Sequence, residues 1–407
     1  MTRTGKLGFL MIAVVFGLGS AAPAGEQQAL RQVTVPFTLD HNRMIVDVEL
    51  VRPDGTIRRA RAWVDTGTEV LIVTEPVARE LGLDLSGFAA GGSKARHSVR
   101  TSSPAPALRI GGLPLDMTGI ETYVRRGALI MPGVPAEVHV GASALRHDHV
   151  VLDYPARRLT VARPGVLKPW GVAVPCRVNP TTGLFMISAT IDGRQVPLGL
   201  DAGSAGTWVS TELTSTWQAR HPPWRHVTGA LGSANFWGEK FERNGVLMRL
   251  PELSIGPILV RDVTVLGLGQ RLFDWYSRKS AGPVAGFLGA NVLERFRLEV
   301  DFPNRMTYWQ AGPEAGDHDL DIVGLTVRAE DDGGFSVAGV VTVDGRPSVE
   351  GIEAGDRLVR IGKLEVAGST MGQVIGALRG RPGVTRTLEV ERDGRRMTAH
   401  ATVMQFP

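Results

Sequence analysis

The sequence predicts a mainly β protein made of two similar halves, followed by a smaller α+β domain. Two observations predict the halves. A hairpin ending in an aspartate occurs twice, before Asp65 and before Asp201, and a later pair of segments aligns without a gap at a fixed offset. A polar stretch at Pro313–Asp319, beyond which new strand signals begin, predicts the separate third domain.

Each aspartate is expected at the end of the second strand of a hairpin. In the first half, the β-prone runs Met44–Val51 and Thr56–Val64 flank a Pro-Asp-Gly turn. In the second half, Phe185–Ile191 and Gln195–Leu200 flank an Asp-Gly turn. A carboxylate at the tip of a tight turn between buried strands is costly unless it is paired or takes part in chemistry.

The second pair of segments indicates an internal duplication. Val140–Val161 and Leu288–Trp309 each lead from an apolar-Gly-Ala motif into two strand signals, and they align at an offset of 148 residues. The two aspartates lie 136 residues apart, so the copies differ mainly in the lengths of their loops.

The composition limits the class of protein. The chain has 407 residues with 50 Gly, 25 Pro and a formal net charge of +4, which is typical of two or three domains rich in turns. No run of five Lys or Arg residues occurs, so we do not expect nucleic acid as a partner. Cys176 is the only cysteine, which excludes an intrachain disulfide, and it is expected in the core.

Residues 1–24 have the features of a signal peptide. Arg3 and Lys6 precede the apolar run Leu7–Leu18, and Ala22-Pro23-Ala24 forms a small-x-small cleavage site. The apolar run is short for a membrane span. We therefore expect a periplasmic or secreted protein, which is anchored in the inner membrane only if this segment stays uncleaved.

Loops and a third domain complete the predicted organisation. The Gly-rich and polar stretches Gly91–Ala107 and Val227–Arg243 predict either mobile covers over a cleft or ordinary surface loops. Beyond the linker, Gly324–Val403 has strand signals, a helix near Thr370–Arg379 and a final hairpin around Asp393-Gly394.

Two aspartates from duplicated halves predict a shared carboxylate pair, Asp65 with Asp201. Like charges at hydrogen-bond distance do not both ionise, so one proton is shared and the two apparent pKa values separate. The ionised member is then able to act as general base on a water, while its protonated partner polarises a peptide carbonyl. This chemistry requires neither a metal nor a cofactor.

The residues around the pair have expected supporting roles. Gly67 and Gly203 provide the narrow turns. The hydroxyls of Thr68 and Ser204 are expected to donate to the carboxylates and hold their orientation. The alternative for the whole arrangement is a pair of capped turn aspartates without reactivity.

Two further features lie in or beside the aligned segments. Gly141 and Gly289 would let a neighbouring strand pass close behind each aspartate turn. His147-Asp148-His149 suggests a metal site, but its counterpart in the second copy is Arg295-Phe296-Arg297. The exposed beginning of a strand is therefore the better interpretation, and we expect no metal.

These motifs resemble those of the retropepsin-like aspartic proteases, particularly the bacterial aspartyl protease group. The resemblance rests on two matching sets: Asp65-Thr66-Gly67 with Val140-Gly141-Ala142, and Asp201-Ala202-Gly203 with Leu288-Gly289-Ala290. It implies two β-barrel lobes related by pseudo-twofold symmetry, residues 30–164 and 165–312. It also implies a cleft between them that binds a polypeptide substrate, and aspartic endopeptidase activity.

Residues 318–407 are similar to bacterial PDZ domains. The similarity rests on the Glu353–Leu358 turn and on Gly324, Leu325, Thr326 and Val327. It implies a small α+β domain that binds a C-terminal peptide as an added strand, with those four residues as the binding loop. Such a domain would recruit peptides or gate the protease. The alternative is a domain that only packs on the two lobes.

One residue departs from the family's pattern. The family has Ser or Thr after the catalytic aspartate, as at Thr66, and this hydroxyl braces the two lobes. Ala202 lacks it, at a cost of about 0.5–1.5 kcal/mol for a lost hydrogen bond. Three functions stay open: an exported aspartic endopeptidase using Asp65 and Asp201, a catalytically silent peptide-binding pseudoprotease, and a homodimer using only Asp65.

Overall fold

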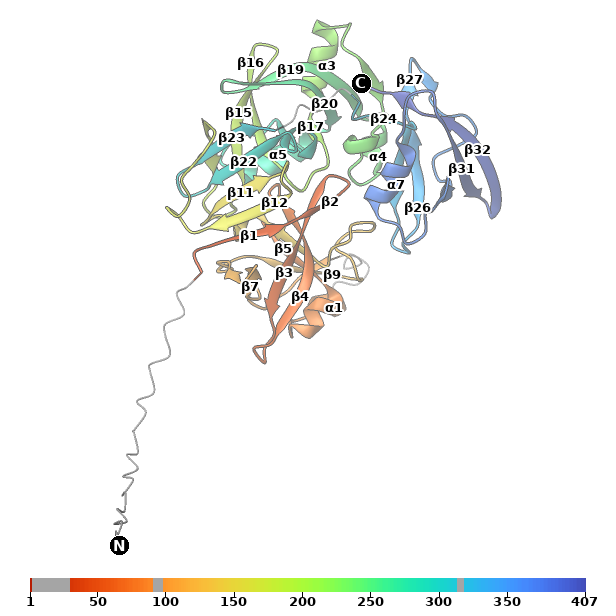
Figure 1. Cartoon of the computed structure of the whole chain (residues 1–407). Helices are drawn as coiled ribbons and strands as arrows, with labels where there is room; N and C mark the ends of the chain where they lie inside the picture. The colour runs from red at the N-terminus through yellow and green to blue at the C-terminus, as the bar shows by residue number, and fades with distance from the viewer. Residues whose placement is uncertain (2–29, 91–97, 313–317) are drawn as a thin grey trace. The chain divides into compact units, whose positions relative to one another are not determined.

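The computed structural model describes Met1 and residues 30–90, 98–312 and 318–407. Most of the predicted signal segment, residues 91–97 of the first Gly-rich stretch and residues 313–317 of the linker therefore lie outside the described residues. Arg31–Pro407 forms one unit by its internal contacts. In this unit strands predominate, as predicted, and helices are short (Figure 1).

The first-half sheet carries Asp65. Its strands, in order across the sheet, are β6 (Ser98–Arg100), β9 (Thr122–Arg125), β5 (Leu71–Thr74), β10 (Val138–Gly141), β4 (Ile57–Asp65), β3 (Arg43–Val51), β7 (Leu108–Ile110) and β8 (Leu113–Pro114), with β2 (Thr38–Asp40) paired to β3. β3 and β4 form the predicted hairpin, and Gly55 in its turn has a φ of +83°, which glycine adopts without strain. β10 runs parallel to β4 and places Gly141 opposite Asp65.

The second-half sheet carries the strand that leads to Asp201. Its strands, in order, are β14 (Arg177–Val178), β15 (Phe185–Ile191), β16 (Arg194–Leu200), β21 (Gly286–Leu288), β17 (Thr207–Ser210), β20 (Ile258–Leu268), β19 (Val246–Ile255), β18 (His226–Thr228), β27 (Thr342–Val343) and β28 (Arg346–Pro347). The β15–β16 turn has φ values of 50° at Asp192 and 71° at Gly193, as in a type I′ hairpin. β21 runs parallel to β16 and places Leu288 opposite Leu200.

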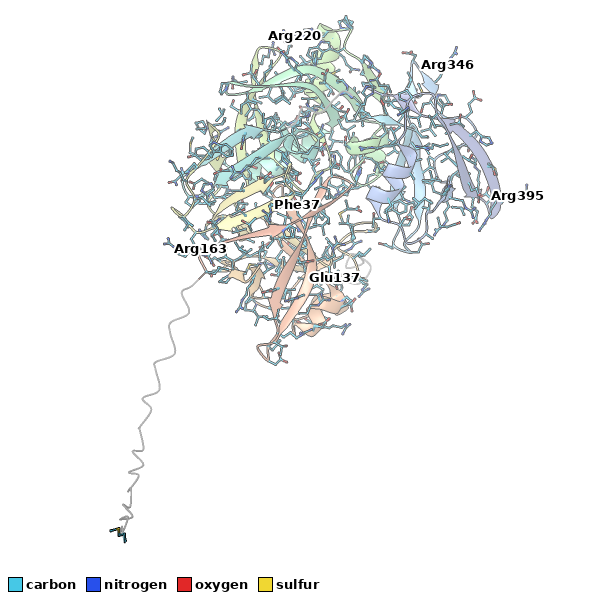
Figure 2. All side chains as sticks on the ribbon, viewed as in Figure 1. Phe37, Glu137, Arg163, Arg220, Arg346 and Arg395 are labelled. Atoms are coloured by element: carbon cyan, nitrogen blue, oxygen red, sulfur yellow. The ribbon has the colours of Figure 1, made fainter. Side chains whose placement is uncertain are left out.

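A further sheet, here called the shared sheet, contains strands from both halves. They are, in order, β1 (Gln32–Pro36), β12 (Arg158–Ala162), β11 (His149–Asp153), β22 (Phe296–Asp301), β23 (Met306–Ala311) and β13 (Val172–Pro175). β11 and β22 pair antiparallel, with Val151 opposite Glu299. Phe37, which lies just after β1 and is labelled in Figure 2, packs edge-on against Tyr154 with ring centroids 5.6 Å apart. The shared sheet thus joins the halves that carry Asp65 and Asp201.

Short helices follow or connect the strands. They are α1 (Glu75–Glu80), α2 (Ser86–Ala90), α3 (Thr211–Arg220), α4 (Lys240–Arg243), α5 (Gln270–Lys279) and α6 (Ala290–Leu293), with single 3₁₀ turns η2 (Ala142–Ala144) and η3 (Gly232–Ala234). Among the helices of the described residues, none has the length and apolar character needed to cross a membrane.

The C-terminal sheet consists of β25 (Leu325–Ala329), β26 (Phe335–Val340), β29 (Arg357–Ile361), β31 (Thr385–Arg392) and β32 (Arg395–Thr402), with β30 (Leu364–Glu365) on β29. β24 (Asp321–Ile322) pairs separately with β33 (Met404–Gln405). The predicted helix is α7 (Met371–Leu378), which begins after a capping box formed by Thr370 and Gln373. The predicted final hairpin is also present, with positive φ at Asp393 and Gly394.

The stretch Val227–Arg243 differs from the expected cover or surface loop. Gly229–Phe236 is buried, and Leu231 and Phe236 share one hydrophobic core with Leu325 of the C-terminal sheet. The apolar residues of this stretch are buried because β25 packs against them, which the pattern of Gly and polar residues did not indicate.

Candidate functional site

The structure brings the two predicted aspartates together. Asp65 ends β4, Asp201 directly follows β16, and the two residues are 5% and 7% exposed. Their carboxyl groups interact, and each changes the pKa of the other. Each also lies against the glycine of the opposite turn. A Cβ on Gly67 would lie 2.6 Å from Asp201 Oδ2, and one on Gly203 would lie 2.6 Å from Asp65 Cβ. Only glycine therefore fits at these two positions.

Backbone N–H groups orient the carboxylates. The N–H of Gly67 donates to Asp65 Oδ1 at 2.8 Å, and the N–H groups of Gly203 and Ser204 donate to Asp201 Oδ1 at 2.9 and 3.0 Å. These bonds follow from the tight turn after each aspartate, which points one N–H group at Asp65 and two successive ones at Asp201.

The hydroxyls of Thr68 and Ser204 do not have the expected role. Ser204 Oγ donates to the carbonyl of Gly206 at 2.7 Å, and the buried Thr68 Oγ1 has no hydrogen-bond partner among the described residues. Their backbone carbonyls instead accept from the N–H groups of Ala142, at 2.7 Å, and Ala290, at 2.8 Å. The two residues thus tie the aspartate turns to the segments that follow Gly141 and Gly289.

Thr66 joins the two turns. Its hydroxyl donates to the carbonyl of Leu200 at 2.8 Å and accepts from the N–H of Ala202 at 2.9 Å. Both Thr66 and Ala202 are buried. Ala202 has no hydroxyl with which to return such a bond, so the brace is one-sided.

Gly141 and Gly289 lie where the segment after each aspartate turn comes close to the neighbouring strand. A Cβ on Gly141 would lie 2.6 Å from the carbonyl oxygen of Val70, and one on Gly289 would lie 3.0 Å from Gly206 Cα. Val70 and Gly206 both follow the aspartate turns. Any larger residue at Gly141 or Gly289 would push a turn away from its neighbouring strand.

Burial and charge separate the proton affinities of the pair. Burial, followed by the charge of Asp65, raises the pKa of Asp201 well above its usual value. Burial acts on Asp65 in the same direction. The hydrogen bond and charge of His139, together with the Gly67 N–H, outweigh it and hold the pKa of Asp65 below its usual value. These surroundings favour one proton shared by the pair, with Asp201 holding it more strongly than Asp65.

Three side chains near the pair were not predicted from the sequence. His139 Nε2 lies 2.8 Å from Asp65 Oδ2. The guanidinium of Arg43 is buried over the ring of Trp63, 5.4 Å from its centroid, and interacts electrostatically with Asp65. Burial, with the negative charges of the site, raises the pKa of Tyr276 well above its usual value.

Only His139 left a signal in the sequence. It stands one residue before the aligned segment that begins at Val140, and the same offset places it opposite Phe287. A polar side chain on a strand that is apolar in the other copy indicates a specific role. No local pattern in the sequence marks Arg43 on β3 or Tyr276 on α5.

The four residues predicted as a peptide-binding loop lie beside the second-half sheet. Gly324, Leu325, Thr326 and Val327 are all buried. The side chain of Asn235 donates to the carbonyl of Val327 at 2.9 Å and accepts from its N–H at 2.7 Å. The Thr326 hydroxyl donates to the carbonyl of Ala230. The outer edge of β25 is thus occupied by the stretch Ala230–Asn235.

The His147–His149 stretch leads into β11 (His149–Asp153), as expected, but only His147 of the three residues is exposed. Asp148 and His149 are each 1% exposed, because β11 lies in the interior of the shared sheet. Asp148 pairs with Arg163 at 2.8 Å (Arg163 is labelled in Figure 2), and His149 pairs with Glu299 at 2.9 Å. Within the described ranges, His, Cys, Asp and Glu side chains form no group of three or more that could hold a metal ion.

Comparisons with known proteins add little to this geometry. No family model matches the sequence, and no curated protein matches it. Among solved structures, the chain is similar to the aspartic proteinase from Irpex lacteus at 13% sequence identity. The match covers 70% of this chain and 98% of that chain, with a TM-score of 0.40.

Proposed function

We propose that this chain is an aspartic-type endopeptidase that hydrolyses peptide bonds with Asp65 and Asp201. The observation that carries the proposal is the close packing of two buried aspartates from separate turns, each against the glycine of the other turn. Gly67 lies against Asp201 and Gly203 lies against Asp65, so each turn leaves room for the aspartate of the other turn. A capped turn aspartate without reactivity would need no such partner.

In the proposed reaction, ionised Asp65 takes a proton from a water molecule. The water oxygen bonds to the carbonyl carbon of the peptide, and Asp201 gives its proton to the carbonyl oxygen. The resulting tetrahedral diol collapses as Asp65 passes its proton to the leaving nitrogen. Asp201 recovers a proton from the diol hydroxyl, which regenerates the singly protonated pair.

We further propose that residues 30–164 and 165–312 are two retropepsin-like lobes related by duplication. Three recurrences support this. β10 runs parallel to β4 as β21 does to β16. Ala142 bonds to the Thr68 carbonyl as Ala290 does to that of Ser204. Both Gly141 and Gly289 are closely approached by the chain after an aspartate turn.

Residues 318–407 are proposed to be a PDZ-like domain that binds a C-terminal peptide along β25. In support, β25 is an edge strand of the C-terminal sheet, and α7 follows later in that domain. Asn235 holds both backbone groups of Val327, so a peptide would add to this edge only after Asn235 has left it. Peptide binding and movement of the Ala230–Asn235 stretch would thus be coupled.

We also propose export to the periplasm or to the medium, with a polypeptide as substrate. The signal-like segment Met1–Ala24 supports export, and retention of that segment would anchor the protein in the inner membrane.

Cleavage of an unfolded protein by the purified chain tests the activity. Asp65→Asn and Asp201→Asn should each abolish cleavage, and a pepstatin-type inhibitor should block the unaltered chain. Melting temperatures check that the variants stay folded. Cleavage that persists in Asp65→Asn refutes the proposal, and a folded chain without any cleavage indicates a silent peptide-binding protein. Unchanged turnover in Asp201→Asn would instead indicate a homodimer that uses only Asp65.

A further inference from the structure

His139 makes a direct contact with the carboxylate pair. It lies on β10, the strand beside β4, and its side chain is 2% exposed. Nε2 lies 2.8 Å from Asp65 Oδ2, while Asp65 Oδ1 accepts the N–H of Gly67 at 2.8 Å. Each oxygen of this carboxylate therefore has its own hydrogen-bond donor in addition to the contact with Asp201.

The surroundings of the imidazole leave Asp65 as its polar partner. The ring packs edge-on against Trp63, with centroids 4.9 Å apart and planes at 73°, and Ile72 stands opposite it on β5. Nδ1 is buried and has no hydrogen-bond partner among the described residues. A buried histidine with one ring nitrogen unpaired is costly. Core packing alone would be served better by an apolar ring.

The second half has that apolar ring. Phe287 stands where His139 would recur, and Gly199 stands where Trp63 would recur. Phe287 fills the space over Gly199, whose Cβ would lie 3.0 Å from the Phe287 Cζ, and it stacks on Trp208 with centroids 4.6 Å apart. The fold thus accepts an aromatic hydrocarbon at this place, and only the first half has a hydrogen-bond donor there.

We propose that His139 is a positioning residue that fixes the negative charge of the pair on Asp65 and leaves the proton on Asp201. This inference rests on the proposed function and assigns the two roles within it. The Nε2–H group donates to the ionised form of Asp65 and stabilises it relative to the protonated form. Asp65 is then the general base, and Asp201 is the acid that polarises the carbonyl.

Other charged and titratable groups face the same pair. Arg43 reaches it from β3, and Tyr276 from α5. Glu69 forms an ion pair with Lys279, and its charge also acts on Tyr276. All of these stay in place when only His139 is changed, so a difference between variants measures the contribution of the imidazole.

The test is the pH dependence of kcat/KM in His139→Phe and His139→Gln. Loss of the imidazole should move the acid limb of the profile upward by about one pH unit in His139→Phe, because Asp65 then ionises at higher pH. The shift should be smaller in His139→Gln, which keeps an N–H donor. The control is His149→Phe, since His149 is equally buried and pairs with Glu299 at 2.9 Å outside the aspartate pair. Its acid limb should stay in place.

Each outcome decides the matter. A lower kcat with an unmoved acid limb in both variants shows a merely structural histidine and overturns the proposal. If His139→Phe does not fold, His139→Gln carries the same comparison. If the unaltered chain cleaves nothing, the proposed function fails instead. Carbon-13 NMR titration of the Asp65 carboxyl in the unaltered chain and His139→Gln then still tests the charge assignment. An unchanged titration overturns it.

Discussion

The brace at Thr66 offers a direct test of how the two aspartate turns are held together. Its hydroxyl donates to the carbonyl of Leu200 at 2.8 Å and accepts from the N–H of Ala202 at 2.9 Å. Thr66→Val removes this hydroxyl at nearly constant volume. Both backbone groups are then left buried without a partner, because Thr66 is 2% exposed and Ala202 is 0% exposed.

The expected loss of stability follows from those two groups. An unpaired buried donor or acceptor costs about 1–3 kcal/mol. Allowing for partial relaxation, we expect Thr66→Val to lower the free energy of unfolding by about 2–4 kcal/mol. Thr66→Ser keeps the hydroxyl and should lose less than about 1 kcal/mol. Proteolysis should slow in Thr66→Val as well, since the aspartates depend on the turns that the brace joins.

Urea denaturation followed by tryptophan fluorescence measures these changes. Thr68→Val is the matched control, because the Thr68 hydroxyl is buried two residues away without a partner among the described residues. Its removal should leave stability unchanged or raise it by up to about 1 kcal/mol. Equal losses in Thr66→Val and Thr68→Val would refute the reasoning, and so would a Thr66→Ser variant as unstable as Thr66→Val.

Three further predictions concern the surroundings of the site. Burial raises the pKa of Glu242 to about 7, above its unfolded value. Folded Glu242 therefore keeps its proton to a higher pH than unfolded Glu242. The free energy of unfolding should be highest below about pH 4.5 and should fall by about 3 kcal/mol as the pH rises to about 7. Glu242→Gln should remove that part of the pH dependence in urea titrations at pH 4 and pH 8. Asn235→Ala should free the backbone of Val327 and tighten the binding of C-terminal peptides, which fluorescence anisotropy measures. An unchanged affinity would contradict the proposal that Asn235 occupies the peptide-binding edge of β25. Gly203→Ala should abolish cleavage and lower the melting temperature, because its Cβ would overlap Asp65, and an active variant would contradict the close contact.

The sequence predicted local features well because local chemistry determines them. The Asp192-Gly193 turn adopts the two positive φ values that this residue pair favours, and Thr370 caps α7. The proximity of Asp65 and Asp201 was also foreseen. That inference came from the repeated motif rather than from either hairpin alone.

Features that depend on long-range packing were not predictable in this way. The burial of Ala230–Asn235 depends on β25, which lies about 90 residues further along the chain. The Thr68 hydroxyl was expected to donate to a carboxylate. Instead the N–H of Gly67 donates to Asp65, and the Thr68 hydroxyl has no partner among the described residues. A sequence shows which groups are able to donate, and the turn geometry decides which of them do.

The two aspartates occupy similar turns with different surroundings. These differences favour Asp65 as the general base and Asp201 as the acid. Asp65 has an imidazole donor where the Asp201 side has Phe287, and burial with the charge of Asp65 raises the pKa of Asp201 well above its usual value. The absent hydroxyl at Ala202 fits this pattern without implying lost activity. Thr66 alone already bonds to both the carbonyl and the N–H that flank Asp201. A hydroxyl at position 202 would add a second brace to turns that are already joined. On the proposed mechanism, the departure at Ala202 lowers stability more than it affects the chemistry, because neither carboxyl depends on that side chain.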